Sequence, residues 1–120
     1  MYLTLQLINR YKLSLVEEIK DKIRDVKDFP KKGISFKDIT PILKYPKLTS
    51  KIVKELSGFI SNSSTHIVGV ESRGFLFGLP VSIEKNISFV LVRKKGKLPY
   101  KTISADYNLE YGQATIEMNL

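Results

Sequence analysis

"HIVGVESRGFLFGLPVSIEKNISFVLVRK", residues 66–94, is the stretch that decides the fold. Residues 66–71 are a short run rich in β-branched side chains, which is typical of a buried strand. A sharp turn is expected at residues 72–74, then a helix over roughly 75–85 and a second strand over 87–94. A strand, a turn, a helix and a strand within about 28 residues indicate a βαβ unit, with parallel strands and a right-handed crossover.

The βαβ unit also predicts where a ligand binds. In open parallel sheets, ligands collect beyond the carboxyl ends of the strands. Residues 71–75 follow the first predicted strand, and residues 93–98 follow the second. The sequence therefore predicts a binding site formed by these two segments.

The residues before this unit predict an amphipathic helix over about 15–27. Ser14 and Glu17 have the spacing of a capping box, in which each side chain satisfies a free backbone donor of the other. Apolar residues recur at helical spacing, and the helix should end before Pro30, which has no amide hydrogen to donate. The apolar positions are Val16, Ile19, Ile23 and Val26.

Three further segments have a predicted structure. Residues 29–41 contain prolines at both ends, and they predict a loop with a short extended piece over 34–39. Pro46 suits the first turn of a second helix, which has apolar residues at intervals of four. Residues 105–118 alternate in character, which indicates a hairpin or a long strand.

The composition restricts the class of protein. The chain has 120 residues, of which 42% are hydrophobic and 27% charged, and this suits one soluble domain. It contains no cysteine and a single histidine, which excludes disulfide frameworks and argues against zinc clusters. The formal net charge of +8 favours an anionic partner, such as a phosphorylated metabolite, nucleic acid or an acidic protein.

Nothing in the sequence indicates a membrane or a secretory pathway. The longest apolar run is far shorter than a membrane span. Residues 1–13 lack the features of a signal peptide and are expected to be a leader that adds little. We expect a cytoplasmic protein with no membrane partner.

The turn and the loop after the two strands are candidate anion sites. Free amides at the start of a helix, together with Arg73 and Gly74, suit a phosphate. The alternative is that Arg73 is solvated and that Gly74 only supplies unusual backbone angles. In "RKKGKLP", residues 93–99, the glycine allows close approach of a ligand and the basic side chains suit a diphosphate. The alternative here is a solvated run of charge.

Two more segments contain candidate residues. Glu110 lies between Leu109 and Tyr111, where partial burial could raise its pKa or let it accept a hydrogen bond from a ring N–H. Phe36 could stack on a planar ring. The alternatives are a surface carboxylate at a strand edge and a phenylalanine that fills a small core.

Four segments together closely resemble the adenine phosphoribosyltransferase family. They are "DFPKKGISFKDITPIL", "GVESRGFLFGLPVS", "VLVRKKGKLPYKTIS" and "YNLEYGQATIEM". The resemblance runs over about residues 15–119. It implies an α/β fold with a phosphoribosyltransferase-type parallel sheet core, incomplete at the C-terminus, and a small N-terminal hood. In domain terms it implies one partial domain, with the N-terminal helix and hood in residues 14–45 and the partial core in 46–120.

Enzymes of this family join adenine to phosphoribosyl diphosphate and release AMP and diphosphate. The resemblance therefore implies these ligands, Mg²⁺ bound through phosphoribosyl diphosphate, no metal site of the protein's own, a homodimer, and no nucleic acid partner. By position it assigns adenine binding to Ser35, Phe36 and Lys37, where many relatives have arginine at the last position. It assigns diphosphate binding to Arg73, Gly74, Arg93, Lys94 and Lys97. It assigns catalysis to Glu110 and Tyr111, with Glu110 as the proton partner of the purine.

The chain departs from the family pattern at its end. The resemblance implies that the family has, after the position of Leu120, a strand with two aspartates and a loop that binds the ribose phosphate. We therefore hold open an alternative, a catalytically inactive truncated paralogue that binds a ligand or a subunit. A basic nucleic-acid binder is a third hypothesis, although the charge is local rather than spread over a face.

Overall fold

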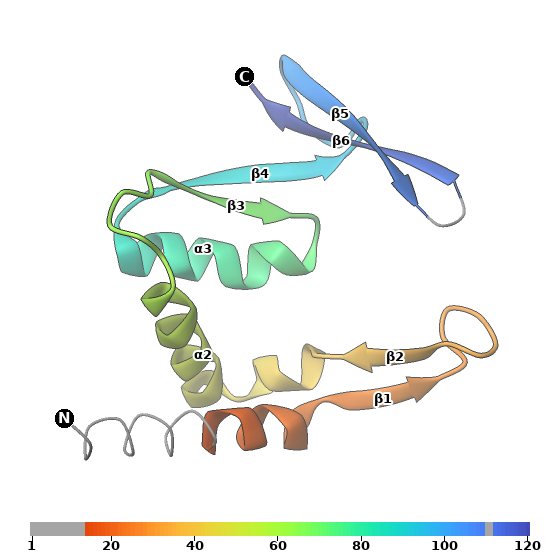
Figure 1. Cartoon of the computed structure of the whole chain (residues 1–120), viewed down its shortest axis with the longest axis vertical. Helices are drawn as coiled ribbons and strands as arrows, with labels where there is room; N and C mark the ends of the chain where they lie inside the picture. The colour runs from red at the N-terminus through yellow and green to blue at the C-terminus, as the bar shows by residue number, and fades with distance from the viewer. Residues whose placement is uncertain (1–13, 110–111) are drawn as a thin grey trace. The chain divides into compact units, whose positions relative to one another are not determined.

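A computed structural model describes residues 14–109 and 112–120 of the chain (Figure 1). The chain divides into two compact units, Met1–Ile52 and Val53–Leu120. Helix α2, Pro46–Gly58, begins in the first unit and ends in the second. Each unit is described by itself.

The first unit contains a helix, a two-stranded sheet and a small apolar core. Residues 14–22 are helical, and β1, Arg24–Lys27, pairs antiparallel with β2, Ser35–Asp38. A 3-10 helix, Thr40–Lys44, leads into α2. The core consists of three buried side chains with partly buried isoleucines packed against them: Leu15, Ile42 and Leu48, with Ile19, Ile23, Ile39 and Ile52.

The prediction of one helix over 15–27 is wrong after residue 22. The helix ends at residue 22, and residues 24–27 are the strand β1. Val26, which continues the helical spacing of apolar residues, lies opposite Phe36 in the sheet. Pairing with β2 satisfies the backbone of residues 24–27, and this tertiary contact outweighs the local pattern. The predicted extended piece over 34–39 is confirmed as β2, and the predicted helix from Pro46 is confirmed as α2.

The second unit is built on a four-stranded sheet with the order β3-β4-β6-β5. Strand β3, His66–Val70, and β4, Ser88–Lys94, are parallel, and α3, Arg73–Lys85, connects them. The predicted βαβ unit is therefore confirmed. The helix begins earlier than predicted, so that Arg73 and Gly74 belong to its first turn, and it ends at Lys85, followed by the C-cap residue Asn86 with left-handed backbone angles.

Small residues allow α3 to lie close against β3. A Cβ atom added at Gly69 would lie 2.5 Å from Cζ of Phe89 and 3.1 Å from the carbonyl oxygen of Gly74. A Cβ atom at Gly78 would lie 2.6 Å from Cε2 of the same ring. The ring of Phe89 therefore occupies the space that side chains at Gly69 and Gly78 would need, and its edge-to-face contact with Phe75 holds it there.

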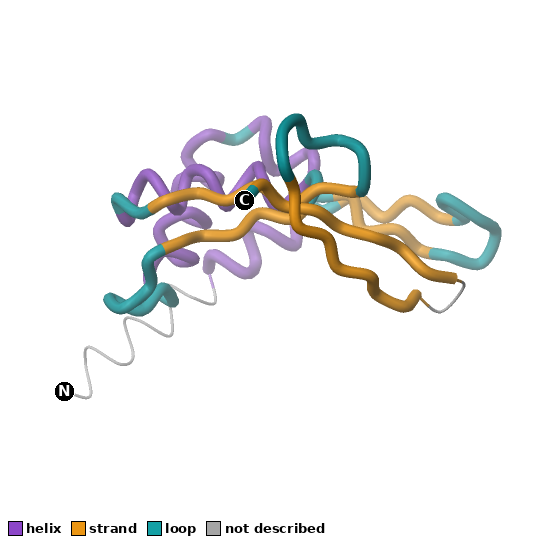
Figure 2. The backbone as a smooth tube through the Cα atoms, turned by 90° about the horizontal axis from the view of Figure 1, so that it is seen from above, coloured by secondary structure: helices purple, strands orange, loops and turns teal. Residues whose placement is uncertain are grey.

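Of the two structures predicted for residues 105–118, a hairpin or a long strand, the hairpin is confirmed. Strand β5, Thr102–Leu109, pairs antiparallel with β6, Gly112–Asn119. Strand β6 in turn pairs antiparallel with β4, so it lies inside the sheet and β5 lies at the edge. Figure 2 shows the two long strands of the hairpin side by side.

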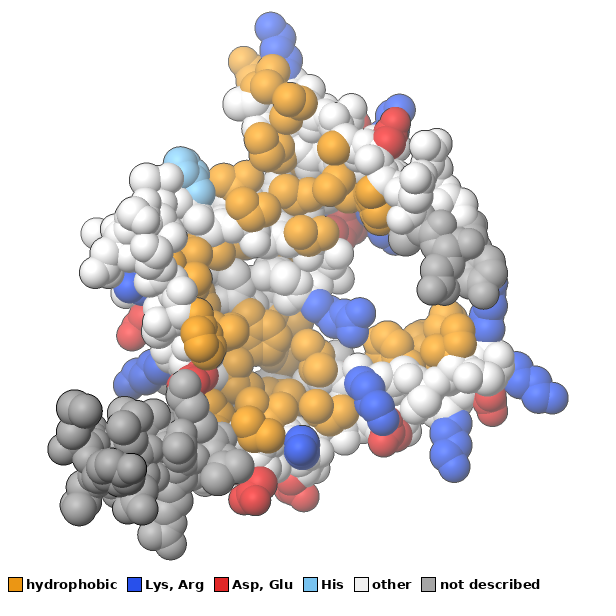
Figure 3. Space-filling view, viewed as in Figure 1, with side chains coloured by type: hydrophobic (Ala, Val, Ile, Leu, Met, Phe, Trp, Pro, Cys, Tyr) orange, Lys and Arg blue, Asp and Glu red, His pale blue; other side chains and the backbone are white. Residues whose placement is uncertain are grey.

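The face of this sheet that points away from α3 is apolar and partly exposed. Val68 and Val70, which alternate with Gly69, are each about half exposed. A groove of about 220 Å³ follows the same sheet between Val92, Ile103 and Met118. Figure 3 shows apolar side chains gathered along β4 and the hairpin. None of the helices within residues 14–109 and 112–120 has the length and apolar character of a membrane span.

The contact between β3 and α3 yields a stability prediction. Replacing Gly69 by alanine forces Phe89 to move and presses on the backbone of α3, so we expect a loss of about 1–3 kcal/mol in the free energy of unfolding. Thermal and urea unfolding would measure this loss. Gly58→Ala is the matched control, because no atom outside the local backbone of its helix lies within 4 Å of the added Cβ and a helical alanine is neutral or stabilising. Equal stability of Gly69→Ala and the unchanged chain would contradict the prediction.

Candidate functional site

The candidate site lies at the carboxyl ends of β3 and β4. The N–H of Glu71 donates a hydrogen bond of 2.8 Å to the carbonyl of Val92, which places the end of β3 beside the last residues of β4. Arg93 and Lys94 are those last residues, and the turn around Gly96 follows them. The structure thus brings the two segments predicted to form a site to one rim of the sheet.

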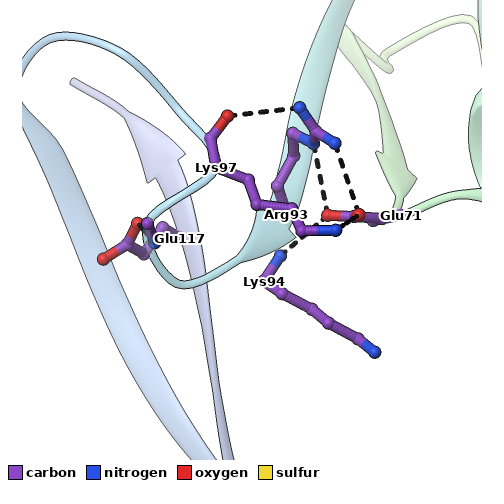
Figure 4. Close-up of polar contacts among 6 residues, drawn as sticks. Glu71, Arg93, Lys94, Lys97 and Glu117 are labelled. Carbon is purple, nitrogen blue, oxygen red and sulfur yellow. Dashed lines mark hydrogen bonds and ion pairs between the residues drawn. The ribbon is translucent and has the colours of Figure 1, made fainter.

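The carboxylate of Glu71 is the centre of this site (Figure 4). Its oxygen Oε1 accepts hydrogen bonds from Nζ of Lys97 at 2.7 Å and from Nη2 of Arg93 at 3.3 Å. Oxygen Oε2 accepts from Nε of Arg93 at 3.2 Å and from the backbone N–H of Lys94 at 3.0 Å. The side chain of Glu71 is only 11% exposed. One nearly buried carboxylate therefore holds two cations and one main-chain amide.

The basic loop, residues 93–98, is fixed by further hydrogen bonds. Nη1 of Arg93 donates to the carbonyl of Lys97 at 3.2 Å, which closes the loop on itself. The amide of Gly96 donates to Glu117 of β6 at 2.9 Å. Gly96 has φ of +80°, a region that favours glycine, so the turn needs this residue. The loop is thus held from β3 by Glu71 and from β6 by Glu117.

The hydrogen bonds of Glu71 lower the pKa of its carboxyl group. Hydrogen bonds from Lys97 and then Arg93 lower the pKa of Glu71 from 4.5 to about 2, although burial acts in the opposite direction. The backbone amide of Lys94 adds to the lowering. Glu71 is therefore ionised at neutral pH and keeps both cations in place.

Arg73 and Gly74 open α3, two and three residues after Glu71. Ser72 precedes them as the N-cap residue of the helix, and the amide of Phe75 donates to its carbonyl. Gly74 does not have a positive φ, so the alternative that it supplies unusual backbone angles is wrong. An added Cβ at Gly74 would lie 3.4 Å from the carbonyl carbon of Gly69, an ordinary van der Waals contact, so Gly74 lies against the backbone of β3.

The residues predicted to bind adenine lie on β2 of the first unit. Phe36 is half buried and makes an edge-to-face contact with Phe29, with the ring centroids 5.2 Å apart. The ammonium of Lys37 donates to Asp25 on β1, and this bond lowers the pKa of Asp25. The hydroxyl of Ser35 lies 3.5 Å from the same carboxylate. Ser35 and Lys37 therefore share Asp25 as a partner, while Phe36, which lies between them on the strand, contacts Phe29 instead.

The two predicted catalytic residues, Glu110 and Tyr111, lie outside the described residues. Strands β5 and β6 lead to them, with Leu109 paired to Gly112. Within residues 14–109 and 112–120 there is no group of three or more histidine, cysteine, aspartate or glutamate side chains that could hold a metal ion.

The sequence interpretation missed Glu71, Glu117 and Asp25. Glu71 was present in the segment 70–78, but only its neighbours Arg73 and Gly74 were given a role. A signal was available, because Glu71 directly follows a predicted strand whose parallel partner ends in a basic loop. Glu117 and Asp25 gave no such signal, since their partners are known only from the strand register.

Known proteins similar to this chain are named adenine phosphoribosyltransferase. The protein of that name from Methanococcus maripaludis is 54% identical over 103 residues, which cover 85% of this chain and 60% of the relative. The one from Ureaplasma parvum is 53% identical over 105 residues, 87% of this chain and 61% of the relative. The chain thus spans about 60% of the length of the curated relatives it matches. No family model matches the chain.

Solved structures agree with these relatives. The structure of adenine phosphoribosyltransferase from Rhodothermus marinus has a TM-score of 0.80 and 47% identity, and the match covers 89% of this chain and 61% of that one. The enzyme from Saccharomyces cerevisiae, solved with adenine and an imino-altritol bisphosphate, has a TM-score of 0.77 and 36% identity, with coverage of 89% and 64%.

The lowered pKa of Glu71 gives a pH prediction. A carboxylate with a lowered pKa in the folded state contributes stability that is present above its unfolded value of about 4.5 and is lost as the pH falls toward 2. We therefore expect the difference in unfolding midpoint between the unchanged chain and Glu71→Gln to be constant above about pH 5 and to shrink below it. Urea unfolding at a series of pH values would measure it. If this difference stayed constant down to pH 2, the result would contradict the lowered pKa of Glu71.

Proposed function

The chain belongs to the adenine phosphoribosyltransferase family, and from this premise we propose that it takes part in purine salvage, the conversion of adenine and phosphoribosyl diphosphate to AMP and diphosphate. In this reaction a bond forms between a ring nitrogen of adenine and C1 of the ribose, and the bond from that carbon to diphosphate breaks. The nitrogen loses its proton, and diphosphate leaves with the electron pair. The observation that carries the proposal is the basic loop, held by Glu71 at the rim where parallel strands bind ligands.

The basic loop suits the leaving group. Negative charge grows on diphosphate as the bond to the sugar breaks, so cations already fixed nearby lower the barrier. We assign this role to Arg93, Lys94 and Lys97. Arg73 and Gly74, in the first turn of α3, would add a guanidinium and backbone amides on the same rim.

The strand β2 suits the base. We assign Phe36 to stacking on adenine and Ser35 and Lys37 to its polar edge. The yeast relative is described as complexed with adenine, which supports a purine site in this family. Because Lys37 already contacts Asp25, we expect its ammonium to be fixed by β1 before the base arrives.

Glu110 and Tyr111 are proposed to act at the reacting centre. The purine must lose a proton, and a carboxylate is a suitable acceptor. Exclusion of water from the sugar would also protect a cation-like intermediate from hydrolysis. This assignment rests on the motif "LEYG" and its place in the family pattern.

Magnesium, the assembly and the cellular location are further parts of the proposal. A carboxylate cage for Mg²⁺ is not found among the described residues, and the loop is cationic, so we propose that the ion binds with phosphoribosyl diphosphate through phosphate oxygens. We also propose a homodimer in the cytoplasm, and a single partial domain with residues 14–45 as hood segment and 46–120 as part of the core.

A direct assay tests the proposal. The chain is mixed with adenine, Mg²⁺ and phosphoribosyl diphosphate, and we expect AMP to form. Lys97→Met should lower kcat/KM roughly a hundredfold, because a cation that stabilises the leaving group is lost. Lys85→Met is the control, since Lys85 ends α3 and so lies toward the other end of the strands.

Other results would favour the alternatives. Salt-sensitive binding of diphosphate without AMP would favour the ligand-binding module. Tight binding of unrelated DNA or RNA, with neither AMP nor diphosphate binding, would favour a nucleic-acid binder.

A further inference from the structure

Glu71 is the residue on which the polar contacts of the rim converge, and the family pattern of binding residues gives it no role. Its carboxylate accepts four hydrogen bonds, two on each oxygen. The donors come from residues 22 to 26 positions further along the chain. A carboxylate that is saturated in this way binds no substrate itself, so its function must lie in the groups it holds.

Arg93 and Lys97 are held to different degrees. Arg93 donates two hydrogen bonds to Glu71 and a third to the carbonyl of Lys97, so three bonds must break before its guanidinium can move. Lys97 reaches Glu71 through a single hydrogen bond from its ammonium, and its side chain is 49% exposed. An incoming anion that takes Lys97 from Glu71 therefore breaks one hydrogen bond, of 2.7 Å, whereas one that takes Arg93 breaks three, of 3.2–3.3 Å.

Lys94 is placed through its main chain rather than its side chain. Its amide donates to Oε2 of Glu71 at 3.0 Å, and Figure 4 shows its side chain pointing away from that carboxylate. Glu71 thus fixes the direction in which Lys94 leaves the strand, while the ammonium of Lys94 stays available to another anion.

We propose that Glu71 is a positioning residue of the diphosphate site: it holds Arg93 and the main chain at Lys94 before the ligand arrives, and it gives up only Lys97 to bound diphosphate. This inference rests on the proposed function for the identity of the ligand. The geometry of the ligand-free chain does not depend on that function, so the two can be tested separately.

A simple electrostatic role for Glu71 predicts the opposite result. If Glu71 only neutralised the loop, its removal would raise the local positive potential and tighten the binding of an anion. If it positions the loop, its removal leaves the cations mobile, and binding must then also order them. Replacing Glu71 by glutamine distinguishes the two roles. Each oxygen of Glu71 accepts two hydrogen bonds, and in either orientation of the glutamine amide an NH₂ group replaces one of these oxygens and faces its two donors.

The experiment compares the full chain with Glu71→Gln and with Glu84→Gln. Glu84 is an exposed carboxylate near the end of α3, so the control makes the same change in charge toward the other end of the strands. Binding of inorganic diphosphate with Mg²⁺ is measured by calorimetry at two salt concentrations. We expect Glu71→Gln to weaken binding roughly tenfold despite its added positive charge. Glu84→Gln should change binding by no more than about twofold.

A second measurement uses the ligand-free chain. In NMR spectra, the amide of Lys94 and Nε–H of Arg93 should shift and exchange faster with solvent in Glu71→Gln. In Lys97→Met both signals should remain, since Arg93 keeps its own bonds to Glu71. If Glu71→Gln does not fold, the spectrum of Lys97→Met still tests the inference, because both signals must remain in it.

The outcomes separate the inference from the proposed function. Equal or tighter diphosphate binding by Glu71→Gln overturns the inference. So do unchanged signals in Glu71→Gln, or the loss of both signals in Lys97→Met. If the unchanged chain binds no diphosphate, the proposed function fails, and the ligand-free spectra alone then decide whether Glu71 orders the loop.

Discussion

The hydrogen bond from the amide of Glu71 to the carbonyl of Val92 extends the parallel pairing of β3 and β4 by one step. Val70 and Val92 are the last paired residues, so this step sets Glu71 beside Arg93. A shift of one residue in the register would turn these side chains to opposite faces of the sheet. The contacts of the rim, including the two cations on one carboxylate, therefore depend on a register that the apolar side chains of the strands select.

The crossover helix imposes a second constraint on the same rim. Since α3 begins at Arg73, only Ser72 separates Glu71 from the helix. The short connection keeps the carboxylate of Glu71 close to the basic loop. The close approach of α3 depends on Gly69 and Gly78, whose missing side chains leave room for the ring of Phe89. Packing inside the βαβ unit thus fixes the start of the helix, and the start of the helix fixes the site.

These constraints explain which features the sequence could predict. The βαβ unit was predictable because the run at 66–71, the glycine-containing turn and the run at 87–94 each carry a local signal that agrees with the fold. The strand at 24–27 was not, because Val26 fits helical spacing equally well and only its pairing with Phe36 decides the matter. The basic loop was recognised as a cluster of charge. The different roles of its residues could not be predicted. Arg93, Lys94 and Lys97 are all basic residues of one loop, and only the structure shows which of them bonds Glu71 through its side chain and which through its main chain.

The balance of charge explains why a basic loop needs carboxylates at all. Arg93, Lys94, Lys95 and Lys97 lie within five positions and repel one another, which would favour an extended, mobile segment. Glu71 opposes this repulsion through side-chain and main-chain bonds, and Glu117 does so through the amide of Gly96. Two carboxylates against four cations leave the loop positive, so it still attracts a polyanion. A loop that is ordered before binding loses less conformational entropy when the anion arrives, and more of the attraction is then available for affinity.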